Sequence, residues 1–240
     1  MKAMIFAAGL GTRLGDISRE IPKALVDING RSALRIAVEN LKAAGFDDLL
    51  VNIHHHPSLM REELDRIRSD GFNITVSDES DELLDTGGGL LRAQGFFNDG
   101  PFVCYNVDIF TDLDLRALYD YNIASGALAT LAVRHRQGNR FLLVDQSGRV
   151  RGWCNNATKE EILTVDSRKL LEEIAFSGIQ VVSPAIFGMM SQGIYSMTSL
   201  YLMLAGKNII NSFIHDEGYW FDCGTPKNLE KIRSFLSGRV

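Results

Sequence analysis

The sequence has few cysteines, no long apolar run and no excess of positive charge, and each shortage excludes a class of protein. Its three cysteines, Cys104, Cys154 and Cys223, form no Cys-x-x-Cys pair, which favours reduced thiols over a disulfide framework. No apolar run is long enough to cross a bilayer, and the short run after Lys2 stops at Gly9 without a signal-peptide cleavage pattern. The formal net charge of -5 argues against a nucleic-acid binder, which usually carries a basic face. We therefore predict a cytoplasmic protein with neither a membrane nor a nucleic-acid partner.

The composition is that of a globular protein with a substantial core. The 240 residues are 45% hydrophobic and 23% charged, and no internal repeat, low-complexity tract or linker divides them. Apolar runs of strand length alternate with segments of helical period, which predicts a mostly parallel sheet covered by helices. We predict one α/β domain over residues 1–240, with later hairpins that form the side facing the acceptor substrate.

The expected elements follow from this alternation and from turn and cap signals. We expect strands at 3–8, 49–53, 72–76, 102–105, 127–134, 140–144, 150–153, 179–182, 209–214 and 219–221. We expect helices at 32–45, 59–68, 90–96 and 115–124, a final helix that starts at Thr225-Pro226, and a loop at 77–89.

A candidate phosphate-binding segment follows the first strand. Gly9 and Gly11 let the backbone approach a polyphosphate closely, while Arg13 and Lys23 bring positive charge. The Walker pattern is absent, and the dinucleotide fingerprint would need a third glycine at Leu14. The two glycines alone could equally form a tight turn that binds no ligand. The presence of Arg13 and Lys23 nearby favours phosphate binding.

The run Ala-Ala-Gly-Leu-Gly-Thr-Arg-Leu at 7–14, with Pro22-Lys23 downstream, resembles the signature of the sugar-1-phosphate nucleotidyltransferases. The resemblance implies a Rossmann-like mixed, mostly parallel sheet flanked by helices, and it extends over nearly all of the chain. Leu84 to Gly89 looks like the second glycine motif of that family. The nucleotide-binding residues that the resemblance implies are Ala7, Ala8, Gly9, Leu10, Gly11, Thr12, Arg13, Lys23, Thr86, Gly87 and Gly88.

Two aspartates lie in motifs that the same family uses for Mg²⁺. Asn106-Val107-Asp108 resembles the family's Asn-Gly-Asp, with valine in place of glycine, and the segment 220–226 resembles the late motif that contains Asp222. The resemblance implies that Asp108 and Asp222 bind Mg²⁺ and, with Gly178 of the segment 176–180, the acceptor. It also implies that Arg13, Lys23 and Asp108 are catalytic.

The chemistry of this family suits the residues present. The attacking phosphate oxygen is already an anion, so the lack of a recognisable Ser-His-Asp or Cys-His arrangement is consistent with the reaction. We predict Mg²⁺-dependent transfer of a nucleotidyl group from a nucleoside triphosphate to a sugar 1-phosphate, by a monomer or homodimer. In its compact length the chain is most similar to the short members of the family, which use mannose 1-phosphate with GTP or N-acetylmuramate 1-phosphate with UTP. Because the chain ends soon after the last expected helix, we expect a single activity.

Two other functions remain open at this point. One is transfer of CMP to phosphocholine, which an acceptor pocket of aromatic and acidic residues would favour. The other is a non-catalytic nucleotide sensor with the same fold. We interpret His54-His55-His56 as a loop near the mouth of the pocket, since three consecutive residues cannot easily converge on one metal ion. We interpret the acidic run 78–82 as a solvated loop.

Overall fold

The contacts within the chain divide it into two compact units, each of which is described by itself. The computed structural model describes residues 1–238. The first unit contains 1–85, 104–113 and 218–240, and the second contains 86–103 and 114–217. Each unit is assembled from segments that are far apart in the sequence, so the single domain over 1–240 stays a prediction.

The first unit is built on a small parallel sheet. Strand β4 lies between β1 and β5, and it pairs in parallel with both. On its other side β1 neighbours β6, of which residues 104–106 belong to this unit. The bounds are β1 (Lys2–Phe6), β4 (Asp48–Ile53), β5 (Asn73–Asp78) and β6 (Phe102–Asn106). Residues 3–6 of β1 are buried, as a strand in the interior of a parallel sheet requires. The carboxyl ends of these strands lead directly into the loops that carry the predicted site.

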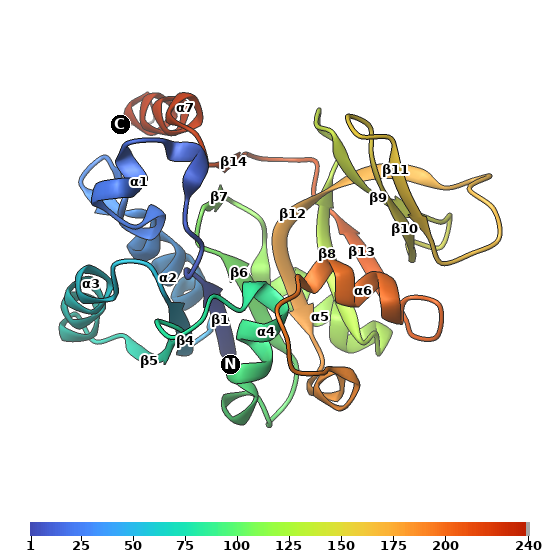
Figure 1. The fold of residues 1–240 in the computed structure, drawn as a ribbon, viewed down its shortest axis with the longest axis horizontal. Helices are drawn as coiled ribbons and strands as arrows, with labels where there is room; N and C mark the ends of the chain where they lie inside the picture. Colours follow the sequence, from blue (N-terminus) through green and yellow to red (C-terminus); the bar gives the residue numbers. More distant parts are fainter. Residues whose placement is uncertain (239–240) are drawn as a thin grey trace. The chain divides into compact units, whose positions relative to one another are not determined.

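The other elements of the first unit are shorter. Strands β2 and β3 form one antiparallel pair, and β7 and β14 form another. These elements are β2 (Asp27–Ile28), β3 (Arg31–Ser32), β7 (Ile109–Thr111), β14 (Trp220–Asp222), α1 (Ile17–Glu20), α2 (Ala33–Ala43), α3 (Pro57–Ser69) and α7 (Pro226–Ser237), with 3₁₀ helices at Thr12–Leu14 and Lys23–Leu25. Figure 1 shows that this unit contains both ends of the described chain.

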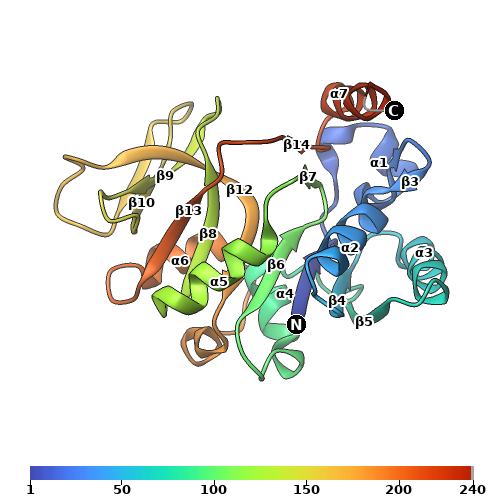
Figure 2. The ribbon, with the colours of Figure 1, turned by 180° about the vertical axis from the view of Figure 1, so that it is seen from behind.

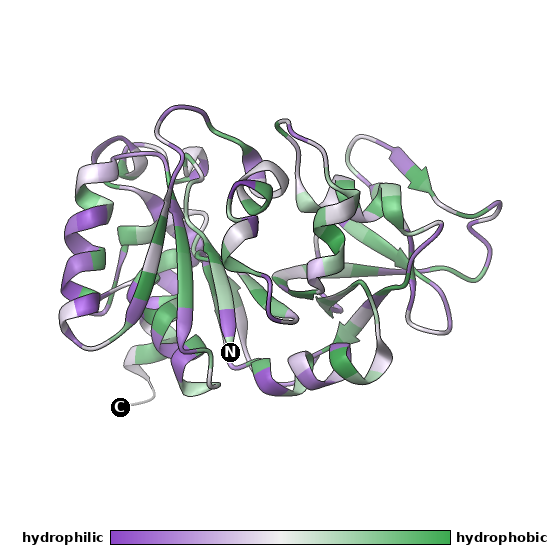
Figure 3. Cartoon of the chain, turned by 90° about the horizontal axis from the view of Figure 1, so that it is seen from below, coloured by the Kyte–Doolittle hydropathy of each residue, from purple (hydrophilic) through white to green (hydrophobic). Residues whose placement is uncertain are grey.

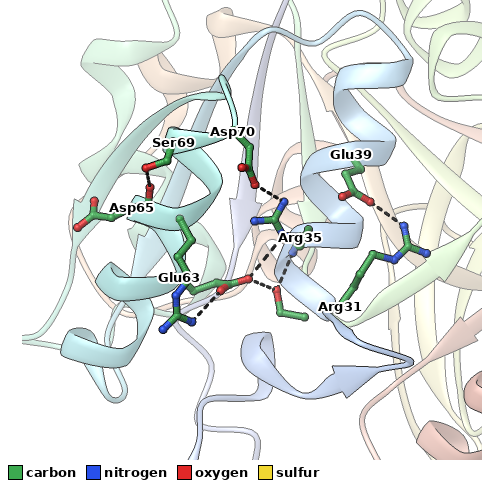
Figure 4. A network of polar contacts seen from close by, with 9 residues as sticks. Arg31, Arg35, Glu39, Glu63, Asp65, Ser69 and Asp70 are labelled. Atoms are coloured by element: carbon green, nitrogen blue, oxygen red, sulfur yellow. Dashed lines mark hydrogen bonds and ion pairs between the residues drawn. The ribbon is translucent and has the colours of Figure 1, made fainter.

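Helices α2 and α3 are joined by a network of charged side chains (Figure 4). The Arg35 guanidinium on α2 lies 2.7 Å from the carboxylate of Asp70, which follows α3, and 3.9 Å from that of Glu63 on α3. Ser32 caps α2 by accepting a hydrogen bond from the backbone N–H of Arg35 and also donates to Glu63 at 2.7 Å. Because Glu63 is mostly buried and has several partners, this network orients the two helices more firmly than a single exposed ion pair would.

The second unit is dominated by antiparallel strands. Its strands are β8 (Ala129–Arg134), β9 (Arg140–Val144), β10 (Val150–Asn155), β11 (Glu160–Leu163), β12 (Glu172–Val182) and β13 (Ile210–Ile214). Strand β12 pairs with both β8 and β9, while β13 pairs with β8 in parallel. Helices α5 (Leu115–Ser125) and α6 (Met197–Leu204) cover opposite faces of these strands, as the opposed views of Figures 1 and 2 show. Apolar residues are concentrated in the strands of each unit (Figure 3).

The fold class predicted from the sequence is confirmed, and so is the type of most elements. The hairpin of 140–144 with 150–153 is present as β9 and β10, and the helix after Thr225-Pro226 is present as α7. Strand β11 and helix α6 were not predicted. Whether the hairpins form the acceptor side stays a prediction.

Two boundaries were wrong in an informative way. Helix α4 (Asp85–Arg92) begins inside the predicted loop 77–89 and contains Gly87, Gly88 and Gly89, all buried. Strand β12 starts at Glu172, seven residues before the predicted strand at 179. In both places tertiary packing outweighs the local propensity on which the prediction was based. Within residues 1–238, no helix is both long and apolar enough to span a membrane.

Candidate active site

The predicted phosphate-binding loop follows the buried end of β1. Ala7 and Ala8 remain buried, whereas Gly9 and Leu10 are exposed. The chain then turns at Gly11, whose φ of +66° lies in the left-handed region that favours glycine. Exposed backbone between a buried strand end and a tight turn is accessible to a ligand from solvent.

Leu14 anchors the far side of this loop in a core that unites distant segments. Its side chain is 2% exposed, and burying a leucine contributes about 1.5–3 kcal/mol. The cluster around it contains residues from the segments 26–36, 110 and 223–232, namely Val26, Ile28, Ala33, Ile36, Phe110, Cys223, Leu229 and Ile232. The adjacent Arg13 is 64% exposed, so the loop presents its cation to solvent while its leucine is held inside.

The Lys23 side chain packs against the glycine turn and forms an ion pair with Asp108. Its ammonium forms a hydrogen bond and an ion pair with the Asp108 carboxylate, and each of the two side chains is only 14% exposed. A Cβ on Gly11 would lie 3.0 Å from the Cβ of Lys23, so the turn packs directly on the lysine stem. Sequence positions 11, 23 and 108 therefore meet in the structure.

The two predicted metal ligands are connected through a strand pair. Asp222, the last residue of β14, lies opposite Ile109 of β7, and the backbone N–H of Cys223 donates to the carbonyl of Asp108 at 2.8 Å. The Asp222 carboxylate accepts from the N–H of Gly224 at 3.0 Å and from the Asn228 side chain at 3.2 Å. Both aspartates are thus fixed at one end of the β7–β14 pair.

Arg13 lies beside both aspartates. One guanidinium nitrogen is 4.0 Å from Oδ2 of Asp108. A Cβ on Gly224 would lie 2.7 Å from that arginine and 2.8 Å from Oδ1 of Asp222, so both side chains pack closely against this glycine. Arg13, Lys23, Asp108 and Asp222 consequently form one cluster of two cations and two anions, which we call the charged cluster.

The remaining predicted residues belong to the second unit. Thr86 accepts a hydrogen bond from the N–H of Met197 at 2.9 Å, and the N–H of Gly87 donates to the carbonyl of Tyr195 at 2.8 Å. A Cβ on Gly87 would lie 2.4 Å from the Tyr195 ring, so this glycine is needed for packing. Gly178 has a φ of +81° and lies within a register shift of β12. These residues are not part of the charged cluster of the first unit.

Comparisons with known proteins identify the family of the chain. The nucleotidyl transferase family matches residues 2–152, which is more than half of the chain. The chain belongs to the nucleotidyl transferase family. The sequence prediction of the family is confirmed.

This nucleotidyl transferase is similar to curated proteins with two different names. It is 27% identical over 243 residues to a mannose-1-phosphate guanyltransferase of Candida albicans, covering 99% of this chain and 63% of that protein. It is 26% identical over 233 residues to an N-acetylmuramate alpha-1-phosphate uridylyltransferase of Caulobacter vibrioides, covering 94% of this chain and 92% of that protein. The chain thus spans less than two thirds of the length of the first relative and nearly all of the second.

The fold of this nucleotidyl transferase is that of a solved structure. HddC from Yersinia pseudotuberculosis superposes with a TM-score of 0.80, with 98% of this chain and 99% of HddC covered. The sequences are 20% identical, so this likeness concerns the fold alone.

The charged cluster has the donor set that Mg²⁺ prefers. Among residues 1–238, no group of three or more His, Cys, Asp or Glu side chains forms a closed metal cage. Mg²⁺ usually binds through one or two carboxylates and completes its coordination with phosphate oxygens and water. Asp108 and Asp222 of this nucleotidyl transferase supply two such carboxylates, which fits an ion that is shared with a substrate.

Two nearby hydroxyl and thiol groups are held in their neutral forms. Burial raises the pKa of the Cys223 thiol to about 12, and the Asp108 carboxylate acts in the same direction. Burial also raises the pKa of Tyr105, whose hydroxyl donates to the carbonyl of Ile109 at 2.9 Å. The charges of this site at neutral pH therefore come from the charged cluster.

The structure corrects the interpretation of the acidic run 78–82 at one position, since residues 80–82 are exposed and Glu79 is not. Glu79 is completely buried, and its carboxylate accepts a hydrogen bond from Asn52 at 2.8 Å. Asn52 was not among the predicted site residues, although an asparagine inside the apolar run 49–53 is a signal that could have identified it. His54 and His55 also have hydrogen-bond partners in this region.

Proposed function

We propose that the chain transfers a nucleotidyl group from a nucleoside triphosphate to a sugar 1-phosphate and releases pyrophosphate. The observation that carries the proposal is the charged cluster, in which residues 13, 23, 108 and 222 meet beside an exposed glycine loop. The names of the two curated relatives support the same reaction class.

The glycine loop and the two cations are proposed to bind the triphosphate. The segment Ala7 to Thr12 offers backbone N–H groups at its exposed turn, and Arg13 and Lys23 add positive charge on the same side. Arg13 is exposed enough to reach an incoming phosphate. Lys23 is close enough to the turn to contact a phosphate bound there. Both cations stabilise the negative charge that shifts towards the leaving pyrophosphate.

The chemical step requires no proton transfer. A phosphate oxygen of the acceptor attacks the α-phosphorus in line, the bond to the bridging oxygen breaks, and the electron pair leaves with pyrophosphate. The chain holds two polyanions together and orients them, which is the main barrier to this reaction. Mg²⁺ held by Asp108 and Asp222 would supply Lewis-acid stabilisation of the phosphoryl oxygens.

The second unit is proposed to complete substrate recognition. Thr86, Gly87 and Gly88 are assigned to the nucleotide, and Gly178, with the two aspartates, to the acceptor. The substrate pairs that the relatives' names support are mannose 1-phosphate with GTP and N-acetylmuramate 1-phosphate with UTP.

A screen of substrates tests the proposal. Pyrophosphate release is measured with ATP, CTP, GTP, UTP and dTTP, each with several sugar 1-phosphates and with phosphocholine as acceptor. Release with a sugar 1-phosphate supports the proposal. Release with phosphocholine alone contradicts it. The absence of release with every pair also contradicts it and favours a non-catalytic nucleotide sensor.

Variants of the charged cluster test the roles of its members. Asp108→Asn and Asp222→Asn should each lower kcat on the order of a hundredfold or more, because each removes one of the two anionic oxygen donors. Glu63→Gln is a matched control, since Glu63 is also a mostly buried carboxylate and accepts from Ser32 at 2.7 Å in the network between α2 and α3. The control should lose stability and keep its kcat, and near-normal turnover in both cluster variants would refute the two-aspartate site.

A further inference from the structure

The carboxyl end of β4 contacts the first residue of the glycine loop through a buried asparagine. Asn52 is 2% exposed, and its Oδ1 accepts a hydrogen bond from the backbone N–H of Ala7 at 2.7 Å. Its Nδ2 donates to Oε1 of Glu79 at 2.8 Å. The two partners differ in polarity, one a donor and one an acceptor, so they fix the orientation of the amide.

Glu79 is in turn held by the backbone and side chains at the end of β4. Its N–H donates to the carbonyl of Ile53 at 2.8 Å, and its own carbonyl accepts from Nδ1 of His54 at 2.6 Å. A carboxylate with no exposed surface is costly unless it is hydrogen-bonded. The rigid attachment of Glu79 therefore also holds Asn52 in place.

The next residue of the same segment contacts the other end of the loop. Nε2 of His55 donates to the carbonyl of Ser18 at 3.0 Å. Ser18 is 8% exposed, and its hydroxyl donates to the carbonyl of Gly15 at 2.8 Å. The segment Asn52 to His55 thus forms hydrogen bonds with the chain at Ala7 and at Ser18, on either side of the exposed turn.

We propose that Asn52 and His55 are positioning residues for the loop that binds the nucleoside triphosphate. This rests on the proposed function of the loop and deepens it. Backbone N–H groups stabilise phosphate charge efficiently only when they are oriented beforehand, because any ordering that occurs on binding reduces affinity. Asn52 fixes the entry of the loop, His55 fixes its exit, and neither touches the phosphates.

The polarity of the Asn52 contacts allows a reversal test. The Asn52→Asp change removes the amide donor and places a second carboxyl group against Glu79. Because two buried carboxylates in contact repel unless they take up a proton, the contact is kept only at the cost of proton uptake, and otherwise the loop entry shifts. Adding Glu79→Gln restores both contacts, since the new aspartate accepts from Ala7 N–H and the new glutamine amide donates to that aspartate. Glu79→Gln alone keeps an oxygen that accepts from Asn52 and should remain close to wild type.

Nucleotide binding is measured by calorimetric titration of the full chain with the magnesium complexes of ATP, CTP, GTP, UTP and dTTP, without acceptor. For a nucleotide that binds wild type, Asn52→Asp should weaken the affinity about tenfold or more, and the double variant should recover to within about threefold. His55→Ala should weaken binding, while His55→Gln, which can still donate to Ser18, should retain most of it. In turnover, KM for the nucleotide should rise while KM for the sugar phosphate is unchanged.

Asn122→Asp is the matched control. Asn122 is 1% exposed and donates to Thr130 and to the carbonyl of Ala127 within the second unit. The control should unfold as readily as Asn52→Asp yet bind nucleotide like wild type. The inference is overturned if Asn52→Asp binds nucleotide with unchanged affinity, or if adding Glu79→Gln does not restore the affinity that Asn52→Asp loses. It is also overturned if Asn122→Asp loses as much affinity, or if the wild type binds no nucleotide. A wild type that binds nucleotide and releases no pyrophosphate would instead overturn the proposed function and leave this test valid.

Discussion

At Gly11, the addition of a single methyl group should have separate effects on the free energy of unfolding and on kcat. Its φ of +66° is unfavourable for any residue with a side chain, and a Cβ there would lie 3.0 Å from the Cβ of Lys23. Gly11→Ala therefore combines backbone strain with pressure on a proposed catalytic lysine. Gly126, the residue that ends α5, has a nearly identical φ of +62° and no atom within 4 Å of its would-be Cβ.

The two effects have different magnitudes. Placing an alanine in the left-handed region costs about 1–2 kcal/mol, and this cost should appear in both Gly11→Ala and Gly126→Ala. In Gly11→Ala the lysine must also yield by a few tenths of an ångström. A misplacement of about 1 Å in an active site can reduce the rate about a hundredfold, so a smaller shift of Lys23 should reduce kcat ~5- to 10-fold.

Denaturant unfolding and pyrophosphate release measure the two effects separately. Both variants should lose similar free energy of unfolding, and only Gly11→Ala should lose kcat. If Gly126→Ala loses as much kcat as Gly11→Ala, or if Gly11→Ala turns over like wild type, the contact between the turn and Lys23 has no catalytic consequence.

Two further predictions concern titratable groups. Because burial raises the pKa of Cys223 to about 12, its thiol should resist iodoacetamide at about pH 8 in the folded protein and react once the chain is unfolded. Peptide mapping measures this labelling, and rapid labelling of Cys223 in the native protein would contradict the prediction. The imidazole of His135 donates hydrogen bonds to Asp216 and to Glu172, which raise the pKa of His135 above 6.5. Its contribution to stability should therefore be full below about pH 6.5 and disappear as the pH rises through the higher folded value. The stability difference between wild type and His135→Gln should accordingly be larger at about pH 5.5 than at about pH 9, and a difference that grows with pH would refute the assignment.

Helix ends were predictable because their signals are local. Ser32 caps α2 by accepting from the N–H of Arg35, and Gly45 takes a φ of +85° just beyond the helix. Thr225 caps α7 in the same way, with Pro226 in the first turn. In each case the few residues that determine the geometry are neighbours in the sequence, so the pattern alone predicts the element.

The glycine helix α4 was not predictable from local signals. Three consecutive glycines favour a loop, since each costs about 1 kcal/mol relative to alanine in a helix. In the structure Gly87 donates to the carbonyl of Tyr195 and leaves no room for a Cβ beside that ring. A partner more than a hundred residues away thus makes glycine necessary in the helix, and sequence periodicity cannot show such a partner.

The sequence indicated the four members of the charged cluster and not the residues that support the loop beside it. Motif resemblance singled out Arg13, Lys23, Asp108 and Asp222, and the structure brings them together. Asn52 was not predicted because its proposed function depends on which backbone N–H it contacts. The parallel register of β1 with β4 determines this contact. Positions that touch a substrate can be recognised by residue type, whereas positions that orient the loop are recognised only once the strands are paired.

The charge balance of the cluster explains why it suits polyanionic substrates in a protein of net charge -5. Lys23 and Asp108 are largely buried and neutralise each other, so the folded chain does not leave an unpaired charge in its interior. Arg13 is mostly exposed, and Asp222 is held by hydrogen-bond donors at both carboxylate oxygens. An arriving triphosphate with its cation adds charges of both signs to this balanced set. Under the proposed function, the site would bind a highly charged complex through local exchanges of ion-pair partners, without a basic surface around it.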